Sequence, residues 1–336
     1  MDFKILDKIL SGERPYRLKQ VNKAIFKDLL TDWDDATNLP LELRSVLSRQ
    51  FPLSIDSRII DSKESDSVKA IIKLNGDMLI ETVLMQHKTG RNTVCVSSQI
   101  GCALDCLFCQ TGKLGYRRNL EPSEIIMQVL FFQRYLKARG SPISNIVFMG
   151  MGEPFLNYDN VLEAVRIIND HEKFEIGARH LSISTAGLPE KIRLFADEKI
   201  QVNLAVSLNA PNDELRSRIM PLNLKYKIPE LMESVKHYIK KTNRKVMFEY
   251  VLIDGLNDSD EIAKELVDLL KGILCLVNLI PYNGGLPLKS PSKSRISAFK
   301  KILLENGLNV TQRSRFGADI KSACGQLVFG EKRSEG

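Results

Sequence analysis

The spacing of hydrophobic and polar residues differs between the first part of the chain and the rest. Residues 1 to about 50 contain three short segments with apolar residues at helical spacing, ILDKIL, YRLKQVNKAIFKDLL and LPLELRSVLSRQF. The polar stretch DSRIIDSKESDS follows, and its composition is typical of a linker. Two β-rich runs then surround an Asn-Gly-Asp turn in KAIIKLNGDMLIETVLM, a pattern that predicts a hairpin.

Further along, strand-like runs alternate with amphipathic helical runs. The series begins with ISNIVFMG and NVLEAVRIIND and ends with ISAFKKILLENG and NVTQRSR. About six strands joined by helices predict a parallel sheet with right-handed crossovers. Small and polar residues follow these strands repeatedly, in GMGEP, STAG, SLNAP and PYNGG. Because sites in such folds form where strands end, the pattern predicts an α/β barrel or partial barrel with its site at that end.

This organisation divides the 336 residues into a helical domain at 1–55, a linker and hairpin at 56–87, and an α/β core at 88–336. No apolar run approaches the roughly 18 to 20 residues of a membrane span, and charge interrupts the first segment from residue 2 onward. We therefore expect no signal peptide, no membrane association and a cytoplasmic location. The 48 Lys and Arg against 41 Asp and Glu give a net charge of +7, which alone favours a polyanionic partner only weakly.

Four of the six cysteines lie in the short stretch VCVSSQIGCALDCLFCQTG. In a reducing compartment, clustered thiols indicate metal binding or catalysis more often than disulfides. A zinc site would need four ligands, and no second cysteine pair follows Cys109, although Cys95 could complete such a site. Three ligands with the spacing of Cys102, Cys106 and Cys109 would leave one iron of a 4Fe-4S cluster open to a cofactor. S-adenosylmethionine can bind such an iron and yield a 5′-deoxyadenosyl radical, so the spacing is typical of radical S-adenosylmethionine (radical SAM) enzymes.

The chain resembles the RlmN/Cfr family of radical enzymes that methylate adenine in RNA. The resemblance rests on CVSSQIGCALDCLFCQTG, FMGMGEPFLN, LSISTAG, VSLNAP, IPYN and FGADIKSACGQL, in one order along the whole chain. GMGEPFLN is more similar to the branch that modifies carbon 2 than to the branch that modifies carbon 8. The resemblance implies a partial (β/α)6 TIM-like barrel with a small N-terminal helical accessory domain for RNA.

The same resemblance implies substrates, cofactors and partners. The substrates would be an adenine of the 2503 type in 23S rRNA and adenine 37 of tRNA. The cofactors would be a 4Fe-4S cluster and two molecules of S-adenosylmethionine per turnover. An electron donor such as flavodoxin would be needed, and the enzyme would be a monomer.

Matching positions give each predicted residue a role. Cys102, Cys106 and Cys109 would hold the cluster, and Phe108 would shield it from water. Residues at successive strand ends would contact S-adenosylmethionine: Gly152, Glu153, Ser184, Ser207, Leu208, Asn209 and Asn283. Taken singly, each is more typical of a cap or a turn. The family has a histidine where this chain has Asn209, so we expect that contact to be made through the backbone or in another way.

Three further residues would carry the chemistry of methylation. Cys324 matches the cysteine that is first methylated and then forms a covalent adduct with RNA. Cys95 matches the thiol that resolves the adduct by attacking the Cys324 sulfur, which leaves a disulfide. Glu81 matches a general base, although without the resemblance it would be interpreted as a surface carboxylate. Basic residues near the reactive segments are expected to contact RNA phosphates: Lys88, Arg91, Lys113, Arg117 and Arg118.

Two alternatives remain open from the sequence. One is a methyltransferase of the carbon 8 branch. The other is a noncatalytic RNA-binding protein in which the cysteines hold a structural zinc. The absence of a second cysteine pair and the C-terminal ACGQL motif favour the radical methyltransferase. Cys275 lies within the apolar run GILCLVNLI and is expected to pack as a small hydrophobe.

Overall fold

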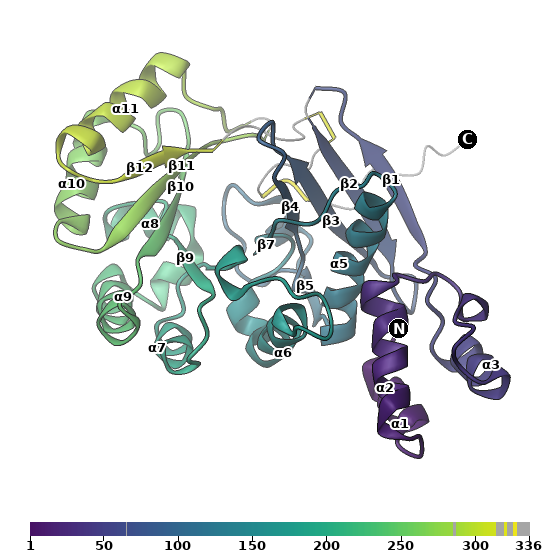
Figure 1. Ribbon diagram of the computed structural model, residues 1–336. Coiled ribbons are helices and arrows are strands. Elements are labelled where there is room, and N and C mark those ends of the chain that lie inside the picture. The colour runs from purple at the N-terminus through teal and green to yellow at the C-terminus, as the bar shows by residue number, and fades with distance from the viewer. Residues whose placement is uncertain (65, 285–286, 314–318, 321–324, 328–336) are drawn as a thin grey trace.

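The fold is seen in a computed structural model that describes residues 1–64, 66–284, 287–313, 319–320 and 325–327. Its main feature is a ten-stranded sheet in the order β1-β2-β3-β4-β7-β8-β9-β10-β11-β12 (Figure 1). Strands β5 (Gln99–Gly101) and β6 (Tyr116–Asn119) form a separate two-stranded sheet. In the described residues, no helix is long and apolar enough to cross a membrane.

Seven strands of the large sheet run parallel, and helices connect each of them to the next. The strands are β4 (Asn92–Cys95), β7 (Asn145–Phe148), β8 (Leu181–Thr185), β9 (Asn203–Ser207), β10 (Val246–Leu252), β11 (Cys275–Pro281) and β12 (Val310–Gln312). The main connecting helices are α5 (Pro122–Lys137), α6 (Tyr158–Asn169), α7 (Pro189–Asp197), α8 (Asp213–Ile219), α9 (Ile228–Thr242), α10 (Asp260–Leu270) and α11 (Lys293–Glu305). This order confirms the predicted six β/α units.

Shorter helical segments lie in the connections between these elements. They are α4 (Gln110–Lys113), η3 (Pro154–Asn157), η4 (Ala178–His180) and η5 (Pro221–Leu224). Two of them adjoin the predicted site, because α4 follows the cysteine-rich loop and η3 begins within the GMGEP motif.

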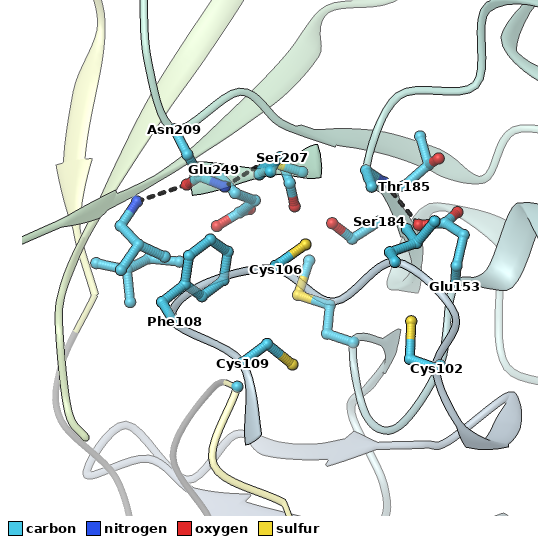
Figure 2. Close-up of a pocket in the computed structure, with 18 of the residues that line it drawn as sticks. Cys102, Cys106, Phe108, Cys109, Glu153, Ser184, Thr185, Ser207, Asn209 and Glu249 are labelled. Atoms are coloured by element: carbon cyan, nitrogen blue, oxygen red, sulfur yellow. Dashed lines mark hydrogen bonds between the residues drawn. The ribbon is translucent and has the colours of Figure 1, made fainter. Parts of the chain in front are cut away.

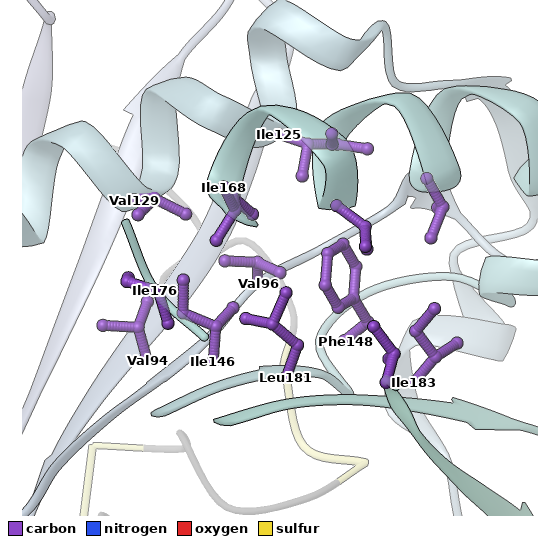
Figure 3. Packing of buried hydrophobic residues seen from close by; sticks show 14 of the residues in the cluster. Val94, Val96, Ile125, Val129, Ile146, Phe148, Ile168, Ile176, Leu181 and Ile183 are labelled. Carbon is purple, nitrogen blue, oxygen red and sulfur yellow. The ribbon is translucent and has the colours of Figure 1, made fainter. Parts of the chain in front are cut away.

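The core lies between the parallel strands and the helices that cover them (Figure 3). Ile146 and Phe148 of β7 and Ile183 of β8 are fully buried and face α5 and α6. Because successive side chains of a strand point to opposite faces, Val147 and Ser184 point into the barrel instead. The alternation that builds the core therefore also presents polar side chains to the barrel interior.

The predicted hairpin is present and belongs to the main sheet. Its strands β2 (Ser67–Lys73) and β3 (Leu79–Gln86) pair antiparallel, and β3 also pairs with β4. An additional edge strand, β1 (Ser57–Asp61), pairs with β2. The interpretation of this stretch as a linker is therefore wrong for residues 57–61. The strand is mostly exposed and is held by backbone pairing, so it leaves no hydrophobic pattern in the sequence.

The N-terminal helical segments pack directly on the barrel helices. They are α1 (Phe3–Leu10), α2 (Pro15–Asn22), η1 (Lys23–Lys27), η2 (Trp33–Asp35) and α3 (Leu41–Gln50). The Phe26 ring meets Phe174 edge-on with 5.0 Å between centroids, and Arg134 of α5 donates to the carbonyls of Leu53 and Leu30. Buried residues of this part share one hydrophobic cluster with the barrel. The division into domains and the role of this part in RNA binding stay predictions.

Candidate active site

A pocket of about 140 Å³ lies at the carboxyl ends of the parallel strands (Figure 2). The cysteine-rich loop between β5 and α4 forms one wall of it, and the ends of β8 and β9 form another. Predicted residues of several segments thereby line one space: Cys102, Cys106, Phe108, Cys109, Gly152, Glu153, Ser184, Ser207 and Asn209. In Figure 2 the sulfur atoms of Cys102 and Cys106 point from the loop toward the strand-end residues Ser184 and Glu153.

The cysteine-rich loop is fixed by backbone contacts on both sides. The Leu107 amide donates to the Ile219 carbonyl at 2.9 Å, and the Cys109 amide donates to the Cys106 carbonyl at 2.9 Å. Gly101 has a φ of +72°, and a Cβ there would lie 1.7 Å from the Gly115 carbonyl oxygen, so only glycine allows this approach. The loop thus presents its three thiols from a defined backbone.

Cys102 is buried, and Cys106 and Cys109 are half-buried in the wall of the pocket. Burial raises the pKa of Cys102 to about 12 and the pKa of Cys106 well above its usual value. Such thiols stay protonated unless a cation compensates the thiolate charge. Within the described part of the chain, no three His, Cys, Asp or Glu side chains converge on a position for one metal ion. The thiols instead line a shared cavity, which suits a cluster of several irons.

The GMGEP motif follows β7 and forms part of the same pocket. Gly152 has a φ of +97°, and a Cβ there would lie 2.4 Å from the Cβ of Gln99, so glycine is required. Glu153 is buried, and its two carboxylate oxygens accept from the backbone amides of Phe155 (2.9 Å) and Ala186 (2.7 Å). Burial raises the pKa of Glu153 to about 7, against the opposing effect of these hydrogen bonds. A bound ammonium group would favour the ionised carboxylate.

The SLNAP motif after β9 contributes to the pocket through only part of its predicted residues. Ser207 and Asn209 line the pocket, whereas the side chain of Leu208 is buried in the main hydrophobic cluster. Asn209 has a φ of +60°, and its side-chain oxygen accepts from the Val251 amide at 2.8 Å. Its side chain is therefore engaged in holding β10.

Asn283 does not line this pocket, although the sequence placed it among the cofactor contacts. Its side-chain oxygen is buried and has no hydrogen-bond partner within the part of the chain that the structure describes. Such an acceptor can take a hydrogen bond from a bound group. The position therefore remains compatible with a cofactor contact.

Two buried charged residues of this region escaped the sequence analysis. Glu249 of β10 lines the pocket, accepts from Asn278 at 2.8 Å, and has its pKa raised by burial. Arg216 of α8 is fully buried and donates to the carbonyls of Ala186 (2.6 Å) and Ser207 (3.1 Å) at the strand ends. A single glutamate within the apolar run KVMFEYVLI was the available signal for Glu249. Arg216 resembled an ordinary charge on an amphipathic helix.

Of the residues expected to carry the methyl transfer, the structure describes Cys95 and Glu81. Cys95, at the end of β4, is buried in a small cluster with Val83, Met85, Met151 and Leu327. Cys324 lies outside the described residues. The nearby segment 325–327 is anchored to the cysteine-rich loop and α4, because the Gln110 amide donates to the Gly325 carbonyl at 2.7 Å and the Thr111 hydroxyl to the Leu327 carbonyl at 2.8 Å. Segment 325–327 therefore connects the pocket with Cys95.

Glu81 is fully buried, so its interpretation as a surface carboxylate is wrong. It lies on β3 and forms an ion pair with Lys69 of β2, with 3.1 Å between Nζ and Oε1. Among the basic residues expected to contact RNA, Lys113 and Arg117 are exposed. Arg118 instead pairs with Glu124 through two hydrogen bonds of 2.6 and 2.8 Å, so it is engaged within the fold.

Comparison with known proteins agrees with this geometry. Residues 96–267 match the model of the radical SAM superfamily. The chain is thus a radical SAM enzyme, a class that uses a 4Fe-4S cluster and S-adenosylmethionine. Within that class it belongs to the RlmN family.

Three relatives support this assignment over nearly the whole chain. The chain is 45% identical over 330 residues to the "Probable dual-specificity RNA methyltransferase RlmN" of Bacillus licheniformis, covering 97% of this chain and 91% of the relative. It is 46% identical over 318 residues to the protein of the same name from Dictyoglomus thermophilum, covering 94% and 91%. A crystal structure of a radical SAM methyltransferase from Sphaerobacter thermophilus superposes with a TM-score of 0.92 at 44% identity, covering 96% of both chains.

Proposed function

We propose that this protein methylates carbon 2 of adenine 2503 in 23S rRNA and also adenine 37 of tRNA. One observation carries the proposal. Segment 325–327 joins the pocket lined by three cysteines, through Gly325, to the buried cluster of Cys95, through Leu327, and Glu81 is buried on the same sheet face as Cys95. The inference that the substrate is RNA rests on the family, whose members carry the name of dual-specificity RNA methyltransferases.

In this proposal the pocket binds both cofactors. Cys102, Cys106 and Cys109 hold the 4Fe-4S cluster as thiolates. Glu153 accepts from the amino group of S-adenosylmethionine, and Gly152 allows that part of the cofactor to approach the backbone. When bound, the two groups supply the methyl group and the one-electron chemistry of the reaction. Ser184 and Ser207 line the same pocket and would contact the ribose or carboxylate parts of the cofactor.

Two thiols, those of Cys324 and Cys95, then act on the RNA. Cys324 would carry the methyl carbon to the base as S-methylcysteine. That methyl group would lose one hydrogen atom through the one-electron chemistry that the cofactors supply, its carbon would bond to the ring, and the surplus electron would return to the same one-electron chemistry. Cys95 attacks the sulfur of Cys324, so that an S–S bond forms and the bond from sulfur to the methyl carbon breaks. That carbon keeps the electron pair and takes a proton, which completes the methyl group. The disulfide must be reduced before the next turnover.

A general base is needed because the substituted ring carbon must lose its hydrogen as a proton. Glu81 is the carboxylate on the face of the sheet that carries Cys95, as strand pairing shows below. Lys113 and Arg117 are exposed near the cysteine-rich loop and can contact RNA phosphates, which supplies affinity independent of sequence. An electron donor such as flavodoxin completes the system.

Mass spectrometry of the nucleosides produced tests this function. The reconstituted protein is incubated anaerobically with S-adenosylmethionine, a reductant and either 23S rRNA or tRNA. The proposal predicts 2-methyladenosine from both RNAs. The product 8-methyladenosine would move the protein to the carbon 8 branch, and methylation of rRNA alone would remove tRNA from the proposal. No methylated adenosine from a cluster-loaded protein would contradict it.

A further inference from the structure

Lys69 and Glu81 form an ion pair in the interior of the protein. Nζ and Oε1 are 3.1 Å apart, and the side chains are 2% and 0% exposed. Removing two charges from water costs several kcal/mol per ion, and apolar residues of similar volume often give equal or greater stability. Stability alone therefore gives a weak reason for this pair. Another lysine of β2, Lys73, pairs with Asp77 of the following turn, and this pair stays in solvent with exposures of 48% and 85%.

Strand pairing places this ion pair on the face that carries Cys95. Lys69 lies opposite Val83, and Val83 lies opposite Cys95. Directly opposed residues of antiparallel strands share a face, and so do residues two apart on one strand. Lys69, Glu81 and Cys95 therefore project from one face of β2, β3 and β4.

The same face is the one against which segment 325–327 packs. Val83 and Cys95 share a buried cluster with Leu327, three residues after Cys324. The backbone beneath Glu81 is also held, because the Ser97 hydroxyl donates to the Glu81 carbonyl at 2.6 Å, and the Thr82 hydroxyl donates to the Cys95 carbonyl at 2.8 Å. The carboxylate of Glu81 thus projects from a backbone fixed to the strand of Cys95.

We propose that Lys69 is a positioning residue for Glu81 in the methylation reaction, which keeps the carboxylate ionised and oriented toward the substrate. The inference rests on the proposed function, and within it on Glu81 as the base. A fully buried carboxylate without a nearby cation takes up a proton, and a protonated Glu81 could not accept one. In the step concerned, an oxygen of Glu81 forms an O–H bond with the hydrogen of the substituted ring carbon. That C–H bond breaks, and its electron pair stays on the ring.

The test compares Lys69→Met and Lys69→Arg with Lys73→Met as the matched control. Three quantities are measured on the cluster-loaded protein: the Kd for RNA, S-methylation of Cys324 by mass spectrometry, and the single-turnover rate of RNA methylation. Lys69→Met should lower the rate about 100-fold, and Glu81→Gln should do the same, because general base catalysis contributes about that much. RNA affinity and Cys324 methylation should change less than about threefold. Lys69→Arg should recover most of the rate, because the guanidinium keeps the positive charge.

A double variant keeps the inference testable if Lys69→Met does not fold. Lys69→Met with Glu81→Gln removes both charges and leaves no unpaired buried ion. If Lys69 acts only through Glu81, the double variant methylates RNA as slowly as Glu81→Gln alone. A further large loss in the double variant, or a folded Lys69→Met with the rate of Lys73→Met, would overturn the inference. Failure of the wild-type protein to methylate RNA would instead contradict the proposed function.

Discussion

The pocket at the ends of β7, β8 and β9 and the face of β2, β3 and β4 both bury polar side chains, but those side chains have different partners. In the pocket, Glu153 accepts from two backbone amides, and behind the strand ends the buried Arg216 donates to the carbonyls of Ala186 and Ser207. On the other face, Glu81 pairs with the side chain of Lys69. Backbone partners fix the shape of a cavity, whereas a charged partner also controls whether a carboxylate is ionised. We infer that the pocket binds the cofactors and that the hairpin face supports the chemistry on RNA.

The largest expected effect is on the pocket side of this comparison. Cys106→Ala removes one of three proposed cluster ligands and should reduce bound iron and sulfide to background after reconstitution, with methylation lost by more than about 1000-fold. Cys275→Ala is the control, because Cys275 is a buried cysteine of the core on β11, away from the loop. It should retain the cluster. A Cys106→Ala protein with a full iron content would refute the ligand assignment.

A smaller effect is expected at the glycine that shapes the pocket. Gly152→Ala would force a Cβ to 2.4 Å from Gln99 at a φ of +97°, so it should cost about 2 to 4 kcal/mol of unfolding free energy and weaken S-adenosylmethionine binding. Gly90→Ala is the control, because Gly90 has a φ of +81° but nothing within 4 Å of the added Cβ. It should cost about 1 kcal/mol. Chemical denaturation gives both values. Equal losses would show that backbone strain, and not the contact with Gln99, sets the loss of stability.

In the protein without cofactors, the carboxyl group of Glu153 should make the free energy of unfolding depend on pH. Burial raises the pKa of Glu153 from 4.5 to about 7. Between these values the native state holds a proton that the unfolded state has lost, so this group's contribution to stability is present below about pH 4.5 and falls as the pH rises to 7. The loss amounts to about 3 kcal/mol. Glu153→Gln should flatten that part of the unfolding curve, and an unchanged slope would contradict the assignment.

The smallest effect is expected at the position where this chain departs from its family. Asn209 holds the Val251 amide, and a histidine nitrogen can accept the same hydrogen bond. Asn209→His should therefore change the Kd for S-adenosylmethionine by less than about threefold, as measured by isothermal titration calorimetry. A large loss of affinity would mean that the αL backbone at this residue requires asparagine.

The sequence predicted the parallel strands and their helices because each alternates one apolar face with one polar face, as in LSIST and NLAVS. It missed β1, which is mostly exposed, and the pair β5 and β6, which depends on the close approach of Gly101 to Gly115. The three cluster ligands were predicted from their spacing, and the roles of Cys95 and Cys324 were predicted from the resemblance. Lys69 was missed because β2 is buried on both faces, and local alternation cannot reveal a lysine that meets its partner across strands.

The central claim is that Cys324 carries the methyl carbon to RNA and Cys95 releases the product, and a trapping measurement tests it most directly. Cys95→Ala is loaded with cluster, supplied with S-adenosylmethionine, reductant and 23S rRNA, digested, and searched by mass spectrometry for a peptide joined to a nucleotide. The account predicts accumulation of a covalent adduct on Cys324, because the thiol that releases it is gone. Free methylated RNA at the wild-type rate, with no adduct, would contradict the account.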